Sequence, residues 1–377
     1  MTGHLTLTPD HPEPAAPRRP AAQARPSRAL RARRLAPAAA AVAAVALVAA
    51  CSSSGTSASI GSGSSGGASA LKGKTITLIA PDNPGGSYDS YARLFAPYIG
   101  QELGATVNVE NVGGGGTLDG TNQMAAASPN GLTIGMVNVG GDVASKVESQ
   151  PTLHDDVTKF AYIGQPAVLP NALVTQSGSS TGSFTALVHS SDPVAVLDIR
   201  NGIGDMLNRV VFGAFGIKHK LDTGFESTTA LKQGFLAKDG LTIFEAVSTL
   251  YPLISGNQAK PLLVTGTVPP SYQKVLSGVP TLDSELSSVS LSASQTKALQ
   301  EANALADLSD DFAAPPGTPA ATVTALRQAF TKAAAQPALQ NQAKKESLPL
   351  AFISGTATTG RVSAAEANSS TIAPYVK

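Results

Sequence analysis

Short apolar runs alternate with amphipathic patterns through the body of the chain. Residues 75–80 and 132–137 are mainly apolar, residues 106–110 place valine at every second position, and all three segments contain β-branched side chains, which is typical of strands. Between these runs, residues 87–104 and 117–127 repeat apolar side chains at helical spacing. This alternation of strands and helices is typical of an α/β layered fold with a mainly parallel sheet. We therefore predict an α/β fold for this region.

The same alternation continues towards the C-terminus, where glycine-rich and proline-rich turns separate the segments. Strands are predicted at residues 173–176, 194–199, 241–244 and 262–265, and helices at residues 206–217, 288–306 and 319–335.

Residues 1–50 have the pattern of a signal peptide with a long basic n-region. They hold seven arginines, no lysine and two acidic residues. The uncharged run 35–50 has the length of a signal-peptide apolar segment and is too short for a comfortable membrane span. Small residues precede Cys51, as in the lipobox of bacterial lipoproteins. We expect Cys51 to be lipidated and to become the mature N-terminus. The alternative is an ordinary signal peptide with an incidental cysteine.

Residues 51–71 are predicted to form a linker. After Cys51 the sequence is dominated by Ser and Gly and carries few apolar side chains. Such a composition is typical of a flexible chain. It would hold a folded domain away from a membrane.

The net charge of +1 hides an asymmetry along the chain. The first 50 positions take 7 of the 27 basic and 2 of the 26 acidic residues, which leaves 20 basic and 24 acidic residues beyond them. A body with a net charge of −4 lacks the basic footprint that nucleic-acid binding needs. The single cysteine excludes an intramolecular disulfide and a zinc site built from several thiolates.

Catalytic and metal-binding motifs do not stand out in the sequence. His154, His189 and His219 are not at metal-ligand spacing, and the sequence has no H-E-x-x-H, Walker A or C-x-x-C pattern. A glycine pair at 202 and 204 follows a strand, but Leu207 stands where a dinucleotide fingerprint needs its third glycine. We therefore predict that the protein is not an enzyme and uses no cofactor or metal.

Three loops at the carboxyl ends of predicted strands are the candidate ligand site. They are residues 84–89, 138–141 and 201–205, and each contains glycine. In open α/β sheets ligands bind at this edge. Glycines let the backbone approach a ligand closely, and the free N–H groups at a helix start favour an anion. The structural alternative for each loop is a capped turn that binds nothing.

Residues 84–94, PGGSYDSYARL, resemble the P-G-G-x-x-D-x-x-A-R segment of the substrate-binding proteins of tripartite tricarboxylate transporters. Residues 128–133, SPNGLT, are similar to the P-D-G-Y-T turn of that family, and residues 312–319, FAAPPGTP, to its F-A-P-x-G-T-P segment. The resemblance runs with gaps over residues 74–340. It is thin in the middle of the chain, where Glu245 replaces the usual aspartate and the loop 223–227 lacks the family's lysine.

The resemblance implies a two-lobed periplasmic-binding-protein-like fold that closes on a small molecule, each lobe being a mainly parallel sheet flanked by helices. One lobe is expected to comprise residues 72–170 plus 267–377, and the other residues 171–266. Together, the loops and the resemblance assign the following ligand-binding residues: Gly85, Gly86, Ser87, Tyr88, Asp89, Asn138, Gly140, Gly204, Asp205 and Glu245.

In the middle lobe the acidic side chains Asp205, Glu226 and Glu245 depart from the family pattern and favour an amine-bearing or neutral ligand.

The function implied by the resemblance is solute capture outside the cytoplasm. We expect a monomeric lipoprotein, anchored to the outer face of the cell membrane, that passes a small organic ligand to the permease subunits of a tripartite tricarboxylate-type transporter. A carboxylate is the expected ligand class. Two alternatives stay open: a ligand-sensing accessory protein for a membrane receptor and, less favoured, a secreted hydrolase.

Overall fold

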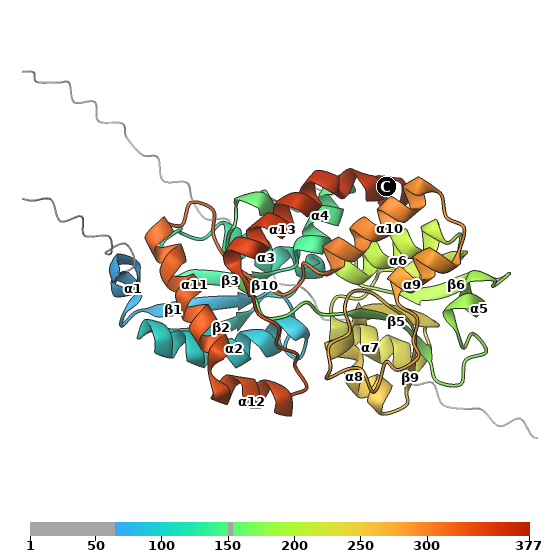
Figure 1. Cartoon of the computed structure of the whole chain (residues 1–377), viewed down its shortest axis with the longest axis horizontal. Helices are drawn as coiled ribbons and strands as arrows, with labels where there is room; N and C mark the ends of the chain where they lie inside the picture. The colour runs from blue at the N-terminus through green and yellow to red at the C-terminus, as the bar shows by residue number, and fades with distance from the viewer. Residues whose placement is uncertain (1–64, 150–153) are drawn as a thin grey trace, which may run out of the picture. The chain divides into compact units, whose positions relative to one another are not determined.

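Two β-sheets organise the folded part of the chain (Figure 1). The computed structural model describes residues 65–149 and 154–377. Within this part, the first sheet has the strand order β11-β4-β10-β3-β1-β2 and the second β7-β6-β8-β5-β9. The strands of the first sheet are β1 Thr75–Ala80, β2 Thr106–Asn111, β3 Thr133–Val137, β4 Ala161–Gln165, β10 Asp311–Ala314 and β11 Ile353–Ser354. Those of the second are β5 Asn171–Gln176, β6 Val194–Leu197, β7 His219–Asp222, β8 Thr242–Ala246 and β9 Ala259–Val264.

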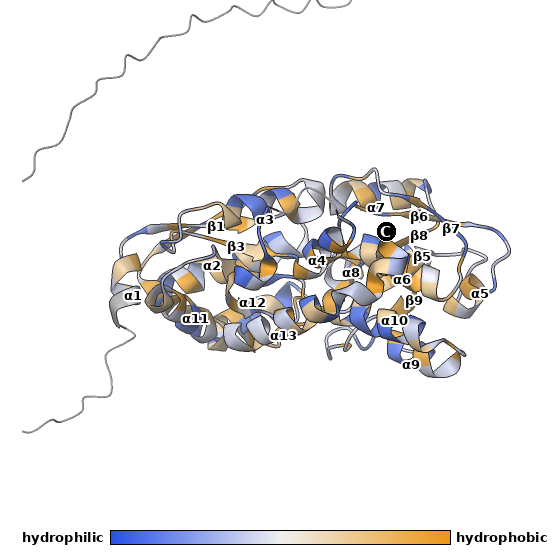
Figure 2. Ribbon diagram, turned by 90° about the horizontal axis from the view of Figure 1, so that it is seen from above, coloured by the Kyte–Doolittle hydropathy of each residue, from blue (hydrophilic) through white to orange (hydrophobic). Residues whose placement is uncertain are grey.

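Helices flank both sheets, and most carry apolar and polar faces side by side, as the mixed colours in Figure 2 show. Near the first sheet lie α1 Ser65–Leu71, α2 Ser87–Leu103, η1 Gly115–Thr117, α3 Leu118–Ala125, α4 Val139–Val147, η2 Val157–Lys159, α11 Ala320–Ala335, α12 Pro337–Lys345 and α13 Gly355–Asn368. The other helices are α5 Phe184–Val188, α6 Ile203–Ala214, α7 Thr228–Ala237, α8 Val247–Ser255, α9 Leu282–Ser288, α10 Ala293–Ala306, η3 Ser369–Ile372 and α14 Ala373–Val376.

The predicted α/β fold class is confirmed, but the sheets are mixed and not mainly parallel. Strands β1, β2 and β3 are parallel to one another, whereas β10 runs antiparallel to both β3 and β4. In the second sheet β6 is parallel to β7 and β8, and β5 is antiparallel to β8 and β9. Because β5 and β10 are each reached by crossing from the other sheet, no strand–helix–strand unit sets their direction.

Two local expectations differ from the structure. Residues 65–71, assigned to the flexible linker, form α1, in which Leu71 is buried. Gly67 allows α1 to lie directly on α11, since a Cβ there would be 2.0 Å from the carbonyl oxygen of Ala321. Residues 138–141, expected to be a loop, are the start of α4: the Asn138 side chain caps the helix by accepting a hydrogen bond from Gly141 N–H at 3.1 Å.

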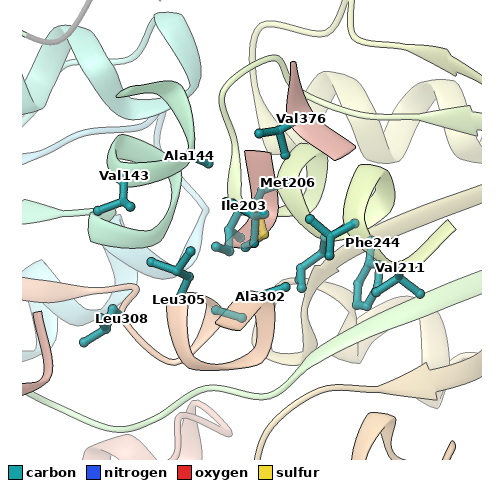
Figure 3. Packing of buried hydrophobic residues seen from close by; sticks show 14 of the residues in the cluster. Val143, Ala144, Ile203, Met206, Val211, Phe244, Ala302, Leu305, Leu308 and Val376 are labelled. Atoms are coloured by element: carbon teal, nitrogen blue, oxygen red, sulfur yellow. The ribbon is translucent and has the colours of Figure 1, made fainter. Parts of the chain in front are cut away.

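A continuous hydrophobic cluster connects the two sheets. It includes Val143 of α4, Ile203 of α6 and Leu305 of α10, all buried, and Figure 3 shows these three side chains directed into the same space. Other clusters lie at each sheet separately. The helices α4, α6 and α10 therefore join the two halves on one side.

The chain passes between the sheets beside a pair of hydrogen-bonded residues. Thr265 N–H donates to the carbonyl oxygen of Asn171 at 2.9 Å, and Asn171 N–H donates to Thr265 Oγ1 at 3.2 Å. The lobe boundaries predicted at residues 170 and 267 lie close to this pair in the sequence and stay a prediction. Among residues 65–149 and 154–377, no helix is both long and apolar enough to span a membrane.

Candidate functional site

The helices α2 and α6 begin in the same way. Each has a glycine N-cap, Gly86 or Gly202, without a side-chain cap. In α2 the carboxylate of Asp89 accepts from Gly85 N–H at 3.0 Å and from Arg93 Nε at 2.8 Å.

In α6 the carboxylate of Asp205 accepts from Asn201 N–H at 3.2 Å and from Arg209 Nε at 2.6 Å. Both aspartates are therefore used to hold the loop in front of their helix. This leaves the first N–H groups of each helix without a capping side chain, a known setting for anion binding.

A cavity of about 50 Å³ lies between the two sheets at these helix starts. It has room for a few water-sized groups. From the side of the first sheet come Pro81, Asp82, Tyr88, Gly114, Gly116, Thr117 and Asn138, and from the side of the second come Ile199, Gly202, Ile203, Glu226, Thr228 and Glu245.

A larger pocket of about 610 Å³ continues the cavity outwards and shares Gly114, Gly116, Ile199 and Glu226 with it. One wall is the glycine turn 113–116, and the other includes Arg200 and residues 223–226. Arg200 and Glu226 are exposed here. The cleft thus leads from an outer part with one basic side chain to a narrow inner part.

The two halves touch each other across the cleft. Thr228 Oγ1 of α7 donates to Asp82 Oδ2 at 3.1 Å. Gly116 faces the carbonyl oxygen of Arg200, which a Cβ on Gly116 would approach to 2.1 Å. Its φ of +68° also favours glycine. These contacts describe a closed arrangement of the cleft.

Buried acidic side chains surround the inner end. Asp82 and Glu245 are each only 8% exposed. Burial raises the pKa of Glu245 to about 8, with a further contribution from the charge of Asp82. Burial likewise raises the pKa of Asp82, and that of Asp310 to about 7. The pKa of Asp198 is raised well above its usual value by burial, followed by the charges of Glu245 and Asp205. Desolvation of the charged form is the main cause at all four.

Three of the predicted ligand-binding residues line the cavity: Tyr88, Asn138 and Glu245. Gly86 lies beside it, since a Cβ there would be 2.6 Å from Asp82 Oδ2. Ser87 is turned to Asp310, with which its side chain forms a hydrogen bond.

The other predicted residues lie outside the cavity lining. Gly85, Asp89 and Asp205 form the supports of the two loops. Gly140 donates its N–H to the carbonyl oxygen of Leu308, and Gly204 lets α6 approach β8, because its Cβ would be 2.1 Å from the carbonyl oxygen of Phe244. Ligand contact by any of the ten residues stays a prediction.

The sequence interpretation missed Asp82, Thr117 and Thr228 in the lining. Asp82 follows directly on the first strand, so its position at the carboxyl edge was a usable signal. Thr117 has a φ of +92°, uncommon for a β-branched residue, and its hydroxyl has no hydrogen-bond partner. Thr228 reaches the site only through tertiary packing, for which the sequence has no local signal.

The fold is that of the two-lobed periplasmic binding proteins. The periplasmic binding protein BugD superimposes with a TM-score of 0.64 at 21% identity, covering 79% of this chain and 95% of BugD. MatC of Rhodopseudomonas palustris with bound malate superimposes with a TM-score of 0.64 at 17% identity, covering 80% of this chain and 99% of MatC. R. palustris Rpa4515 with adipate superimposes with a TM-score of 0.64 at 17% identity, covering 80% of this chain and 97% of Rpa4515. The expected binding-protein fold is therefore confirmed, and these neighbours include no enzyme by name.

Curated relatives match a shorter stretch. A UPF0065 protein of Agrobacterium vitis is 31% identical over 114 residues, which are 30% of this chain and 32% of the relative. Protein BugT of Bordetella pertussis is 28% identical over 125 residues, 32% of this chain and 37% of BugT. The match therefore spans about a third of the length of these relatives. No family model matches the chain.

Proposed function

We propose that the protein is an extracytoplasmic solute-binding protein that captures a small organic molecule in the cleft between its two sheets. The observation that carries the proposal is the cavity between the uncapped starts of α2 and α6, one from each half. The fold shared with BugD and MatC supports it. Opening and closing of the two halves would admit and enclose the ligand.

The ligand is proposed to carry a carboxylate group. Backbone N–H groups at the starts of α2 and α6 offer hydrogen-bond donors and the positive ends of two helix dipoles. The malate bound to MatC and the adipate bound to Rpa4515 are both carboxylates. The ligand of this chain would be held largely by the backbone amides at these helix starts.

The proposal extends to anchoring and delivery. Cys51, which lies outside the described residues, is proposed to carry the lipid that holds the protein at the outer face of the membrane. The basic n-region and the lipobox pattern of the sequence support this step. The closed form is proposed to present a surface to permease subunits of a tripartite tricarboxylate-type transporter, with the protein acting as a monomer.

A thermal-shift screen tests solute capture. The panel contains di- and tricarboxylates, aromatic acids and amino acids. A ligand present at a hundredfold excess over its Kd should raise the Tm by about 4 °C. If the folded protein is stabilised by no member of the panel, the proposal is wrong.

A bulky residue at the start of α2 tests the position of the site. In Gly86→Trp the indole would meet Asp82 beside it and Thr228 across the cleft, so ligand binding should be lost. Gly360→Trp is the matched control, because a Cβ on this exposed glycine of α13 meets no atom within 4 Å. Full affinity in Gly86→Trp would remove this loop from the site.

A further inference from the structure

The inner end of the cleft brings carboxyl groups from both halves of the protein together. Asp82 follows β1 and Glu245 lies in β8, and both line the cavity while being more than nine-tenths buried. Their charges act on each other, since Asp82 is the main charged neighbour that raises the pKa of Glu245. Glu226 adds a third carboxylate at the exposed rim.

No basic side chain of the described residues lines this cavity. Lys232 of α7 acts on Asp82 and on Glu245 through its charge, but it neither lines the cavity nor forms an ion pair with them. Arg93 and Arg209 are bound to Asp89 and Asp205. Arg200 lines the outer pocket.

Among the described residues, Glu245 therefore forms no ion pair, although the charge of Lys232 acts on it from a distance. The carboxylate of Glu245 accepts a hydrogen bond from the backbone N–H of Ala246. A buried charge that lacks a counter-charge is costly unless a partner supplies it. Glu245 lines the cavity in which the ligand would be enclosed.

A metal ion is a poor fit as that partner. The described residues contain no group of three or more His, Cys, Asp or Glu side chains arranged to hold one. A protonated amine needs fewer ligands and can donate three hydrogen bonds, which suits the carboxylates of Asp82 and Glu245 and the free hydroxyl of Thr117.

We propose that the ligand carries a protonated amine, which lies against Asp82 and Glu245 at the inner end of the cleft while its carboxylate lies against the helix starts. The substrate class is then an amine-bearing carboxylic acid. This inference rests on the proposed function. It differs from the malate and adipate of the two structural neighbours, which have no amine.

Isothermal titration calorimetry with matched pairs of ligands tests the inference. Each pair has an equal carbon chain and equal carboxylates and differs only in the amine, as in aspartate and succinate or in 2-aminoadipate and adipate, with chain lengths from three to six carbons. We expect the amine-bearing member of at least one pair to bind at least tenfold more tightly than its partner. Tighter binding of the amine-free members throughout would overturn the inference and leave solute capture intact. Binding of no ligand would overturn both.

Charge removal at Glu245 is the second test. Glu245→Gln keeps the shape of the side chain, so the affinity for the amine-bearing ligand should fall by about thirtyfold or more. The amine-free partner should lose no affinity. Glu301→Gln is the matched control, because Glu301 is equally buried and has a pKa raised to about 7 but lies in α10 outside the cleft. Equal losses for both members of a pair in Glu245→Gln would contradict the inference.

Discussion

Individual side chains in this protein divide between those that shape the cleft and those that face it. Asp89 and Asp205 were predicted as ligand residues, yet their carboxylates are occupied by a backbone N–H and an arginine. A sequence places an aspartate three residues beyond a glycine N-cap, but it does not reveal whether the carboxylate turns back to the loop or out to a ligand. Glu245 was assigned through the family resemblance, in which it stands at the position of an aspartate, and it lines the cavity.

Removal of the Asp205 side chain should weaken the protein as well as its site. In Asp205→Ala, Asn201 N–H and Arg209 lose their buried acceptor, which should lower the free energy of unfolding by about 1–3 kcal/mol. Urea unfolding measures this loss. Asp192→Ala, at an exposed position, should change stability by less than about 0.5 kcal/mol. Equal stability of the two variants would show that the Asp205 contacts are not important.

Secondary-structure elements were predictable where the pattern is local. The strands β1, β2 and β3 and the helix α11 were predicted within about two residues, since each combines an apolar repeat with a clear turn. Short or polar strands were not predicted. Examples are β7 and β10, which have four residues each. The direction of β5 and β10 depends on crossings between sheets, which a local pattern does not encode.

The helix α10 is expected to stabilise both halves, because Leu305 is fully buried with side chains of α4 and α6. Leu305→Ala should cost about 2–5 kcal/mol of the free energy of unfolding. Leu236→Ala is the control, since Leu236 is 45% exposed on α7. Chemical denaturation monitored by circular dichroism measures both. A loss below about 1 kcal/mol for Leu305→Ala would mean that the cluster repacks around the smaller side chain.

At the scale of the whole molecule, buried acids make stability depend on pH. Burial raises the pKa of Glu245 and Asp142 to about 8, and that of Asp310 and Glu301 to about 7. Each value lies above that of the unfolded chain, so the folded state holds more protons between about pH 4 and pH 8. Stability conferred by these groups is therefore lost as the pH rises.

The free energy of unfolding without ligand should be lower at pH 8 than at pH 5, as measured by urea unfolding at both values. Asp142→Asn should reduce the difference, because both carboxylate oxygens of Asp142 are buried without a hydrogen-bond partner and burial alone raises its pKa. Greater stability at pH 8 than at pH 5 would show that other groups dominate the titration.

The close approach of Gly116 to Arg200 means that the fraction of closed molecules depends on the size of the side chain at position 116. A single methyl group at position 116 would overlap the carbonyl oxygen of Arg200 and would also resist the left-handed backbone there. Gly116→Ala should hold the halves apart and give a larger radius of gyration in small-angle X-ray scattering, even with ligand present. One carbon atom at the rim would then determine whether the two halves can close.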